Sequence, residues 1–254
     1  MSDASPSEAQ PQAWKRIALI LLLGVVVGLL LLIARAKTAP DGSWLASKGV
    51  LLMLKVLLVG VSVPSWYWTQ TLIARRGLQD GRIGDFFHRI SEPWNTWLHA
   101  HRRVSSGILI ASSACIDLLG LFLLGLGLFG PTLRPFLALV ILFAFRQFCQ
   151  ATCVLPAPAK MIWHHPGFPS LLVTYATDND FFFSGHTAIA VLGAITAAQF
   201  LPFGFALAAV LVAVLEGSVV IVLRAHYTMD VMCAIVAAFC ASGVAGWVCT
   251  AGGL

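Results

Sequence analysis

The stretch Arg224-Ala225-His226-Tyr227-Thr228-Met229-Asp230 lies between two long apolar runs of the sequence and carries five polar side chains. At helical pitch His226 and Asp230 are four positions apart and share one face. We therefore expect the carboxylate to bind one imidazole nitrogen while the other nitrogen points away. This pattern predicts half of a catalytic site.

A second polar stretch, Ser184-Gly185-His186-Thr187, also lies where a polar loop meets an apolar run. From His186 to His226 is 40 residues. At ~1.5 Å per helical residue this is ~60 Å, or two crossings of a ~30 Å hydrocarbon layer. Two crossings return the chain to the same membrane face, so the sequence predicts that the two histidines meet.

The composition indicates a membrane protein. Of 254 residues, 59% are hydrophobic and 11% charged, and the mean hydropathy is +0.87, which predicts an all-α, polytopic membrane helix bundle. The net charge is +5, and six arginines lie in residues 74–103. We expect this segment to lie in the headgroup layer against anionic lipids, and nucleic acid is not an expected partner. That segment contains Arg75, Arg76, Arg82, Arg89, Arg102 and Arg103.

The chain divides into a disordered tail, residues 1–14, and a single transmembrane catalytic domain, residues 15–254. We predict seven spans: 17–34, 44–73, 104–129, 133–154, 184–201, a return crossing that ends at Leu223, and 228–249. The first span is an addition to a six-helix core. The basic segment 74–103, an active-site loop 155–183 and the junction 224–228 then share one side, which the arginines place in the cytoplasm.

The sequence predicts neither a metal nor a cofactor. All six cysteines lie inside apolar runs and no C-x-x-C occurs, so we interpret them as small core residues. The neighbouring pair His164-His165 has no second cluster to complete a metal site and fits a loop at the interface.

A histidine backed by a carboxylate is a candidate nucleophile, and a second histidine can protonate a leaving oxygen. The pattern suits displacement at phosphorus through a phosphohistidine: His226 attacks, Asp230 orients it, and His186 acts as general acid and then base. Either histidine alone fits an interfacial polar residue, but the combination favours chemistry because ionisable groups at membrane depth are usually functional.

These residues carry a resemblance. Ser184-Gly185-His186-Thr187 and His226-x-x-x-Asp230 resemble the second and third motifs of the type 2 phosphatidic acid phosphatase superfamily. The fuller match is to its sphingomyelin synthase branch, in which an aspartate precedes the first histidine by six positions, as Asp180 does here. Arg146 followed by Leu155-Pro156-Ala157-Pro158 resembles a further element of those enzymes. The Pro-Leu-Pro-Asp element of the branch has no clear counterpart, and residues 78–87 occupy its place.

The resemblance implies a phosphotransferase that needs no cofactor. It moves phosphocholine or phosphoethanolamine from a membrane phospholipid to a ceramide-like lipid alcohol or to water and releases diacylglycerol. The superfamily's Lys-x6-Arg-Pro motif is missing and Val220 occupies the place of its later arginine, so Arg146 and Arg224 are the expected phosphate ligands. Asp180, Ser184 and the face of Tyr227 are the expected headgroup contacts.

Two alternative functions stay open from the sequence. One is a lipid phosphate phosphatase of phosphatidic acid type, and the other is a noncatalytic membrane scaffold that binds lipid. The side of the membrane is open as well, because members of the sphingomyelin synthase family tend to work on the exoplasmic face, whereas the arginines indicate the cytoplasmic side. A homo-oligomer is a further partner that the sequence allows.

Overall fold

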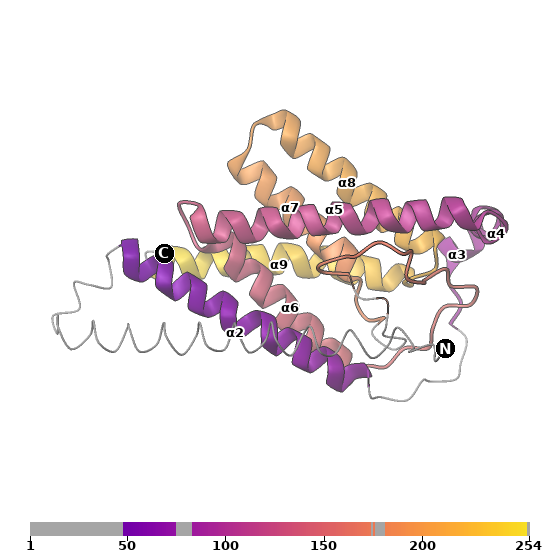
Figure 1. Cartoon of the computed structure of the whole chain (residues 1–254), viewed down its shortest axis with the longest axis horizontal. Coiled ribbons are helices and arrows are strands. Elements are labelled where there is room, and N and C mark those ends of the chain that lie inside the picture. Colours follow the sequence, from indigo (N-terminus) through magenta and orange to yellow (C-terminus); the bar gives the residue numbers. More distant parts are fainter. Residues whose placement is uncertain (1–47, 75–82, 174, 176–180, 253–254) are drawn as a thin grey trace, which may run out of the picture. The chain divides into compact units, whose positions relative to one another are not determined.

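The computed structural model describes residues 48–74, 83–173, 175 and 181–252, and every regular element in these ranges is an α-helix (Figure 1). The chain divides between residues 69 and 70 into two units. Most of helix α2 (Lys48–Ala74) lies in the first unit. Pro64 lies inside α2 and has no N–H to donate to the Gly60 carbonyl. The next residue, Ser65, donates its hydroxyl to the Val61 carbonyl (2.7 Å).

The second unit contains two short helices and five longer ones. In chain order these are α3 (Phe86–Ile90), α4 (Glu92–Ala100), α5 (Arg102–Phe129), α6 (Arg134–Thr152), α7 (Gly185–Phe200), α8 (Phe203–Val222) and α9 (Thr228–Gly252). Four helices of the described ranges, α5, α6, α8 and α9, are long and apolar enough to cross a membrane. The predicted all-helical membrane bundle is therefore confirmed.

The predicted count of seven spans is only partly covered by the described residues. The tail 1–14 and the span 17–34 lie outside them, and the span 44–73 falls largely on α2. Helix α7 is apolar but has only 16 residues. It is ~24 Å long, against a hydrocarbon layer of ~30 Å.

Helix α7 forms the centre of the bundle and packs against α5, α6, α8 and α9. Figure 1 shows it paired with α8 in a hairpin. Its small residues Ala190, Gly193 and Ala197 are buried, as expected for close helix packing. A Cβ added at Gly193 would lie 2.9 Å from the Leu119 side chain, so α5 approaches α7 closely there.

The three polar segments that were predicted to share one side meet in the structure. Helices α3 and α4 lie at the start of α5 (Figure 1). From α4, the buried Asn95 amide donates to the Lys160 carbonyl (3.3 Å) in the loop and to the Val222 carbonyl (2.9 Å) at the end of α8. The loop and α8 are joined directly by the Ile162 N–H, which donates to the Leu223 carbonyl (2.7 Å).

The loop between α6 and α7 is anchored to α5 by a carboxylate. Asp117 accepts hydrogen bonds from the Ser170 hydroxyl and from the N–H groups of Leu171 and Leu172 (2.8 Å each). The Leu172 side chain lies against Gly120, where an added Cβ would be 2.0 Å from its Cδ1. Because Asp117 gives these loop groups an acceptor, the loop can pack on an apolar helix without losing its hydrogen bonds.

The contact between α5 and α6 gives the first prediction. A Cβ at Gly127 would lie 2.4 Å from the Cβ of the buried Phe136. Neither atom is at the end of a flexible side chain, so the two helices must move apart. We expect Gly127→Ala to lower the free energy of unfolding by about 1–3 kcal/mol, measured by thermal unfolding in detergent.

Gly125→Ala is the matched control, because a Cβ at Gly125 meets nothing within 4 Å. It should leave the unfolding free energy within about 1 kcal/mol of the wild-type value. Equal effects of the two substitutions would contradict the close approach of α5 to α6.

Candidate active site

The Ser184-Gly185-His186-Thr187 motif forms the start of α7. Ser184 is the N-cap, and its hydroxyl oxygen accepts hydrogen bonds from the N–H (3.3 Å) and the hydroxyl (3.0 Å) of Thr187. His186 is the second residue of the helix and is buried, and its Nε2 has no hydrogen-bond partner among the residues that the structure describes. The Trp163 ring meets the imidazole edge on, with ring centroids 5.3 Å apart. The motif therefore presents an unpaired imidazole nitrogen inside the protein.

The second motif lies on a turn and not on a helix. Helix α8 ends at Val222 and α9 begins at Thr228; the residues between form the α8–α9 turn (residues 223–227). Arg224 has a positive φ of 56°, which is uncommon outside glycine. The N–H groups of Ala225 and His226 both donate to the Val220 carbonyl (2.9 and 3.3 Å). His226 therefore lies in the turn, outside both helices.

The expected hydrogen bond between His226 and Asp230 is not observed. The His226 Nδ1 lies 2.7 Å from the Phe181 carbonyl oxygen and 3.7 Å from Asp230 Oδ2. Spacing of four residues implies a shared helical face only if both residues are helical, and His226 precedes α9. Asp230 Oδ2 instead accepts the Tyr227 N–H (2.8 Å), and its Oδ1 is buried without a partner.

The Phe181 carbonyl determines the tautomer of His226. A carbonyl oxygen only accepts, so Nδ1 must carry the proton. In the neutral ring Nε2 then has the free lone pair that a nucleophile needs. The Asp230 carboxylate, close but not hydrogen-bonded to the ring, can balance positive charge that develops on it.

Residues 181–184 join the predicted site residues to one another. Besides Phe181 and His226, the Phe183 carbonyl accepts from Arg146 Nε (2.9 Å), and the Ser184 N–H donates to the Asp230 carbonyl (3.2 Å). His186 lies two positions after Ser184 on α7, within electrostatic range of His226 and Arg146. The structure therefore brings Arg146, Ser184, His186, His226 and Asp230 together.

Arg146 lies directly against the Ser-Gly-His turn. Its guanidinium is buried, and NH1 also donates to Gln150 (3.2 Å) one turn along α6. A Cβ at Gly185 would lie 3.4 Å from Arg146 Nε, which is tight contact. Glycine at this position therefore lets a guanidinium lie beside the backbone of the motif, where it suits a phosphate oxygen.

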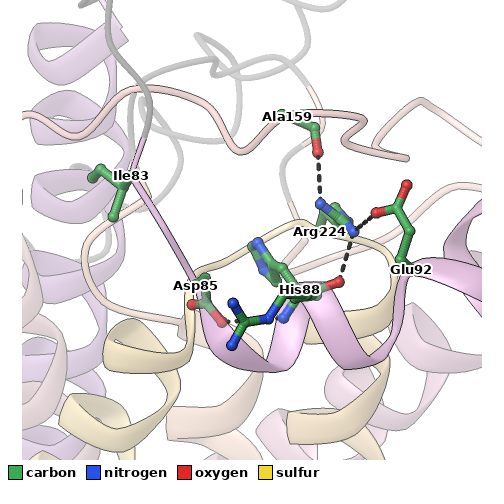
Figure 2. A pocket seen from close by; sticks show the side chains of 7 residues that line it. Ile83, Asp85, His88, Glu92, Ala159 and Arg224 are labelled. Carbon is green, nitrogen blue, oxygen red and sulfur yellow. Dashed lines mark hydrogen bonds and ion pairs between the residues drawn. The ribbon is translucent and has the colours of Figure 1, made fainter.

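Arg224, the other predicted phosphate ligand, has a different environment. Its NH2 donates to the His88 carbonyl (2.7 Å) and pairs with Glu92, and NH1 donates to the Ala159 carbonyl at 3.4 Å (Figure 2). It lines a cavity of about 340 Å³ with residues of the α3–α4 segment (residues 83–100). The cavity lining is Ile83, Asp85, His88, Arg89, Glu92, Ala159 and Arg224. These contacts connect the α8–α9 turn to α3, to α4 and to the loop between α6 and α7. A phosphate contact for Arg224 stays a prediction.

Tyr227 and Asp180 complete the predicted set. Tyr227 is buried; its hydroxyl donates to the Pro156 carbonyl (3.1 Å), and its ring stacks on His88 with centroids 5.5 Å apart. Burial, together with the Asp230 and Asp85 charges, raises the Tyr227 pKa. Asp180 lies outside the described residues. Headgroup contacts by either residue stay predictions.

Sequence reasoning missed the residues of the α3–α4 segment that reach the site. Asp85 contacts Thr228, His88 contacts His226, and Glu92 pairs with Arg224 and Lys160. Burial raises the Asp85 pKa, but hydrogen bonds from Thr228 and His88 outweigh it, so this pKa lies below its ordinary value. An aspartate just before Phe86-Phe87 is a helix-start signal that the sequence offered.

Comparison with known families agrees with the sequence motifs. Residues 178–244 match the family model of the PAP2 superfamily C-terminal domain. This PAP2-matched segment contains both histidine motifs, and PAP2 members are generally phosphatases or phosphotransferases. Comparisons with curated proteins and with solved structures find no match. The match supports an enzyme of the lipid phosphatase and phosphotransferase type.

The Glu92 ion pairs predict a pH dependence of stability. The hydrogen bond from Lys160 is the main cause that lowers the Glu92 pKa; burial opposes it and the Arg224 charge adds to it. A lowered pKa means that the stabilisation is complete above the ordinary value of 4.5 and is lost as the pH falls through the folded-state value. Wild type should therefore unfold at a higher temperature than Glu92→Gln at about pH 6, and the difference should shrink as the pH falls below 4.5.

The comparison of the two proteins at each pH removes the general effect of acid. A difference in unfolding temperature that stays constant over the whole range would show that the Glu92 charge is not the cause.

Proposed function

We propose that this protein is a membrane lipid phosphotransferase of sphingomyelin synthase type. It moves a phosphocholine or phosphoethanolamine headgroup from a phospholipid, through a phosphohistidine on His226, to a ceramide-like alcohol or to water. Diacylglycerol is the first product. The observation that carries the proposal is the hydrogen bond from His226 Nδ1 to the Phe181 carbonyl, which leaves Nε2 as the nucleophilic nitrogen.

In the first step His226 Nε2 attacks phosphorus and the bond from phosphorus to the diacylglycerol oxygen breaks. The negative charge of the bound lipid phosphate favours a protonated His186, which gives its proton to that oxygen, so diacylglycerol leaves neutral. Positive charge forms on the His226 ring, where Asp230 Oδ2 lies 3.7 Å from Nδ1. A carboxylate already in place for this charge stabilises the transition state more than the ground state.

In the second step the acceptor hydroxyl gives its proton to His186 and its oxygen attacks phosphorus. The nitrogen–phosphorus bond breaks, and His226 returns to the neutral form with Nδ1 protonated. With a ceramide-like acceptor the product is a phosphosphingolipid; with water it is the free phosphorylated headgroup. Arg146, buried beside Gly185, is the proposed ligand of the phosphate oxygens in both steps.

The membrane partners follow from the α3–α4 segment. Its exposed apolar side chains include Phe86, Phe87, Trp94 and Trp97, and basic residues lie beside them. Aromatic and basic side chains together suit a position in the headgroup layer against anionic lipids. We also propose that the site faces the cytoplasm, as the arginines indicate, and that the protein forms a homo-oligomer.

A lipid phosphate phosphatase is the second candidate, because the PAP2-matched segment is equally compatible with a monoester substrate. Products distinguish the two. The purified protein in mixed micelles of phosphatidylcholine, phosphatidylethanolamine and phosphatidic acid is assayed by mass spectrometry with and without ceramide. We expect diacylglycerol to rise together with a phosphosphingolipid when ceramide is present.

Other products would change the conclusion. Free phosphate from phosphatidic acid would establish the phosphatase instead, and a free phosphorylated headgroup would establish a hydrolase. Absence of turnover, or turnover that survives His226→Gln, would favour a noncatalytic lipid-binding scaffold.

The separate roles of the two histidines predict different responses to the leaving group. p-Nitrophenolate leaves without a proton, so with p-nitrophenyl phosphocholine the His186→Gln enzyme should recover most of the ~10²–10⁴-fold loss in the first step that it shows with phosphatidylcholine. The second step still lacks its base, so nitrophenolate should appear as a burst of about one per enzyme, followed by slow turnover. His226→Gln should show neither burst nor turnover because the nucleophile is absent. Rapid-mixing kinetics measure the burst, and a burst in His226→Gln would refute its role.

A further inference from the structure

One carboxylate joins the start of α3 to the start of α9. Asp85 Oδ1 accepts from the N–H groups of Phe87 (2.9 Å) and His88 (3.1 Å), which begin α3. The same carboxylate accepts from Thr228 twice, from its N–H and from its hydroxyl, both at 2.7 Å. Thr228 is the first residue of α9 and directly follows the α8–α9 turn. Asp85 therefore determines where α3 lies relative to that turn.

His88 uses this placement to contact the nucleophile's own backbone. It is buried, and its Nε2 lies 2.9 Å from the carbonyl oxygen of His226. Since the carbonyl accepts, His88 Nε2 is the donor. The His88 ring also stacks on Tyr227, with an interplanar angle of 28°. His88 thus contacts two consecutive residues of the turn.

The third connection runs from the turn back to α3 and α4. Arg224 donates to the His88 carbonyl and pairs with Glu92, as Figure 2 shows. Side chains or backbone of residues 85–92 therefore contact Arg224, His226, Tyr227 and Thr228. Within the turn, the N–H groups of Arg224, Ala225 and His226 donate to carbonyls of α8, whereas the carbonyl of His226 accepts from His88.

The His226 residue is consequently fixed at two points. Its ring is fixed through Nδ1 by the Phe181 carbonyl, and its peptide is fixed through the carbonyl oxygen by His88. The direction of Nε2 depends on both contacts. The imidazole ring turns about the side-chain bonds, and the position of the backbone decides where those bonds start. Nucleophilic attack is sensitive to such placement, and errors of ~1 Å can cost ~10²-fold in rate.

We propose that Asp85 and His88 are positioning residues for the nucleophile: Asp85 places α3 against the start of α9, and His88 fixes the His226 peptide so that Nε2 faces the lipid phosphorus. This assignment rests on the proposed role of His226. Neither residue touches the reacting atoms in it. The interfacial α3–α4 segment thereby becomes part of the catalytic apparatus.

The test compares substitutions that keep or remove each donor. His88→Phe keeps a ring to stack on Tyr227 but removes the donor, so kcat should fall ~10²-fold while KM for phosphatidylcholine changes less than ~2-fold. His88→Gln keeps an N–H donor at a similar reach and should restore kcat to within ~5-fold of wild type.

The Asp85 contact is tested at Thr228. Thr228→Val removes the hydroxyl that donates to Asp85 and should lower kcat roughly tenfold, whereas Thr228→Ser keeps the hydroxyl and should not.

Thr250→Val is the matched control, because the Thr250 hydroxyl donates to the Gly246 carbonyl on an exposed part of α9.

A second readout does not depend on lipid turnover. Carbethoxylation of each histidine by diethyl pyrocarbonate is followed by mass spectrometry. In His88→Phe the rate at His226 should rise severalfold, because a released peptide lets the ring move away from the Phe181 carbonyl, while the rate at the buried His186 should stay at the wild-type value.

The outcomes separate this inference from the proposed function. If wild type turns over no lipid, the proposed function fails, and the labelling of His226 still decides whether His88 positions it. Unchanged His226 labelling and unchanged kcat in His88→Phe would overturn the inference. A parallel rise at His186 and His226 would overturn it too, because His88 would then support the fold as a whole.

Discussion

The hydrogen bond from His226 Nδ1 to the Phe181 carbonyl is the contact on which the site depends. At 2.7 Å it joins the two motifs that the chain separates by two helices, and it selects the tautomer that leaves Nε2 unprotonated. A carbonyl is a neutral acceptor, so it determines the proton's position without supplying a charge. The negative charge comes from Asp230. Its carboxylate is held by the Tyr227 N–H and lies 3.7 Å from the His226 ring, close enough to stabilise a positive charge there.

That arrangement requires His226 to lie outside a helix. On a helix its backbone carbonyl would accept from a residue four positions on; in the α8–α9 turn it accepts from the His88 imidazole instead. The positive φ of Arg224 breaks the helix before the histidine, and the buried Val220 carbonyl takes the two N–H groups that follow. The backbone irregularity, with its strain, coincides with the candidate nucleophile, as is common at functional sites.

The sequence predicted the parts of the fold that follow from apolar runs and from simple spacing. Runs of apolar residues predicted the helices α5 to α9, and the length of chain between His186 and His226 predicted that they would meet. The predicted hydrogen bond between His226 and Asp230 is absent, because the i, i+4 rule assumes a helix and nothing in the residue types marks a break at Arg224; the two groups still lie 3.7 Å apart. The Phe181 carbonyl could not be predicted, since every residue carries one. Asp85 and His88 lie far away in sequence, and only tertiary packing places them beside residues 226–228.

The short helix α7 has a consequence for where chemistry takes place in the bilayer. Its 16 residues cover ~24 Å, and α9 beside it has 25 residues and covers ~38 Å. This hydrophobic mismatch within one bundle is met by thinning of the surrounding lipid or by polar groups that reach inward from the surface. Under the proposed function, His186 at the start of the shorter helix would lie nearer to the level of the acyl ester bonds than to bulk water. A lipid phosphate reaches such a depth without leaving its leaflet, whereas a water-soluble phosphate ester would have to leave its hydration shell.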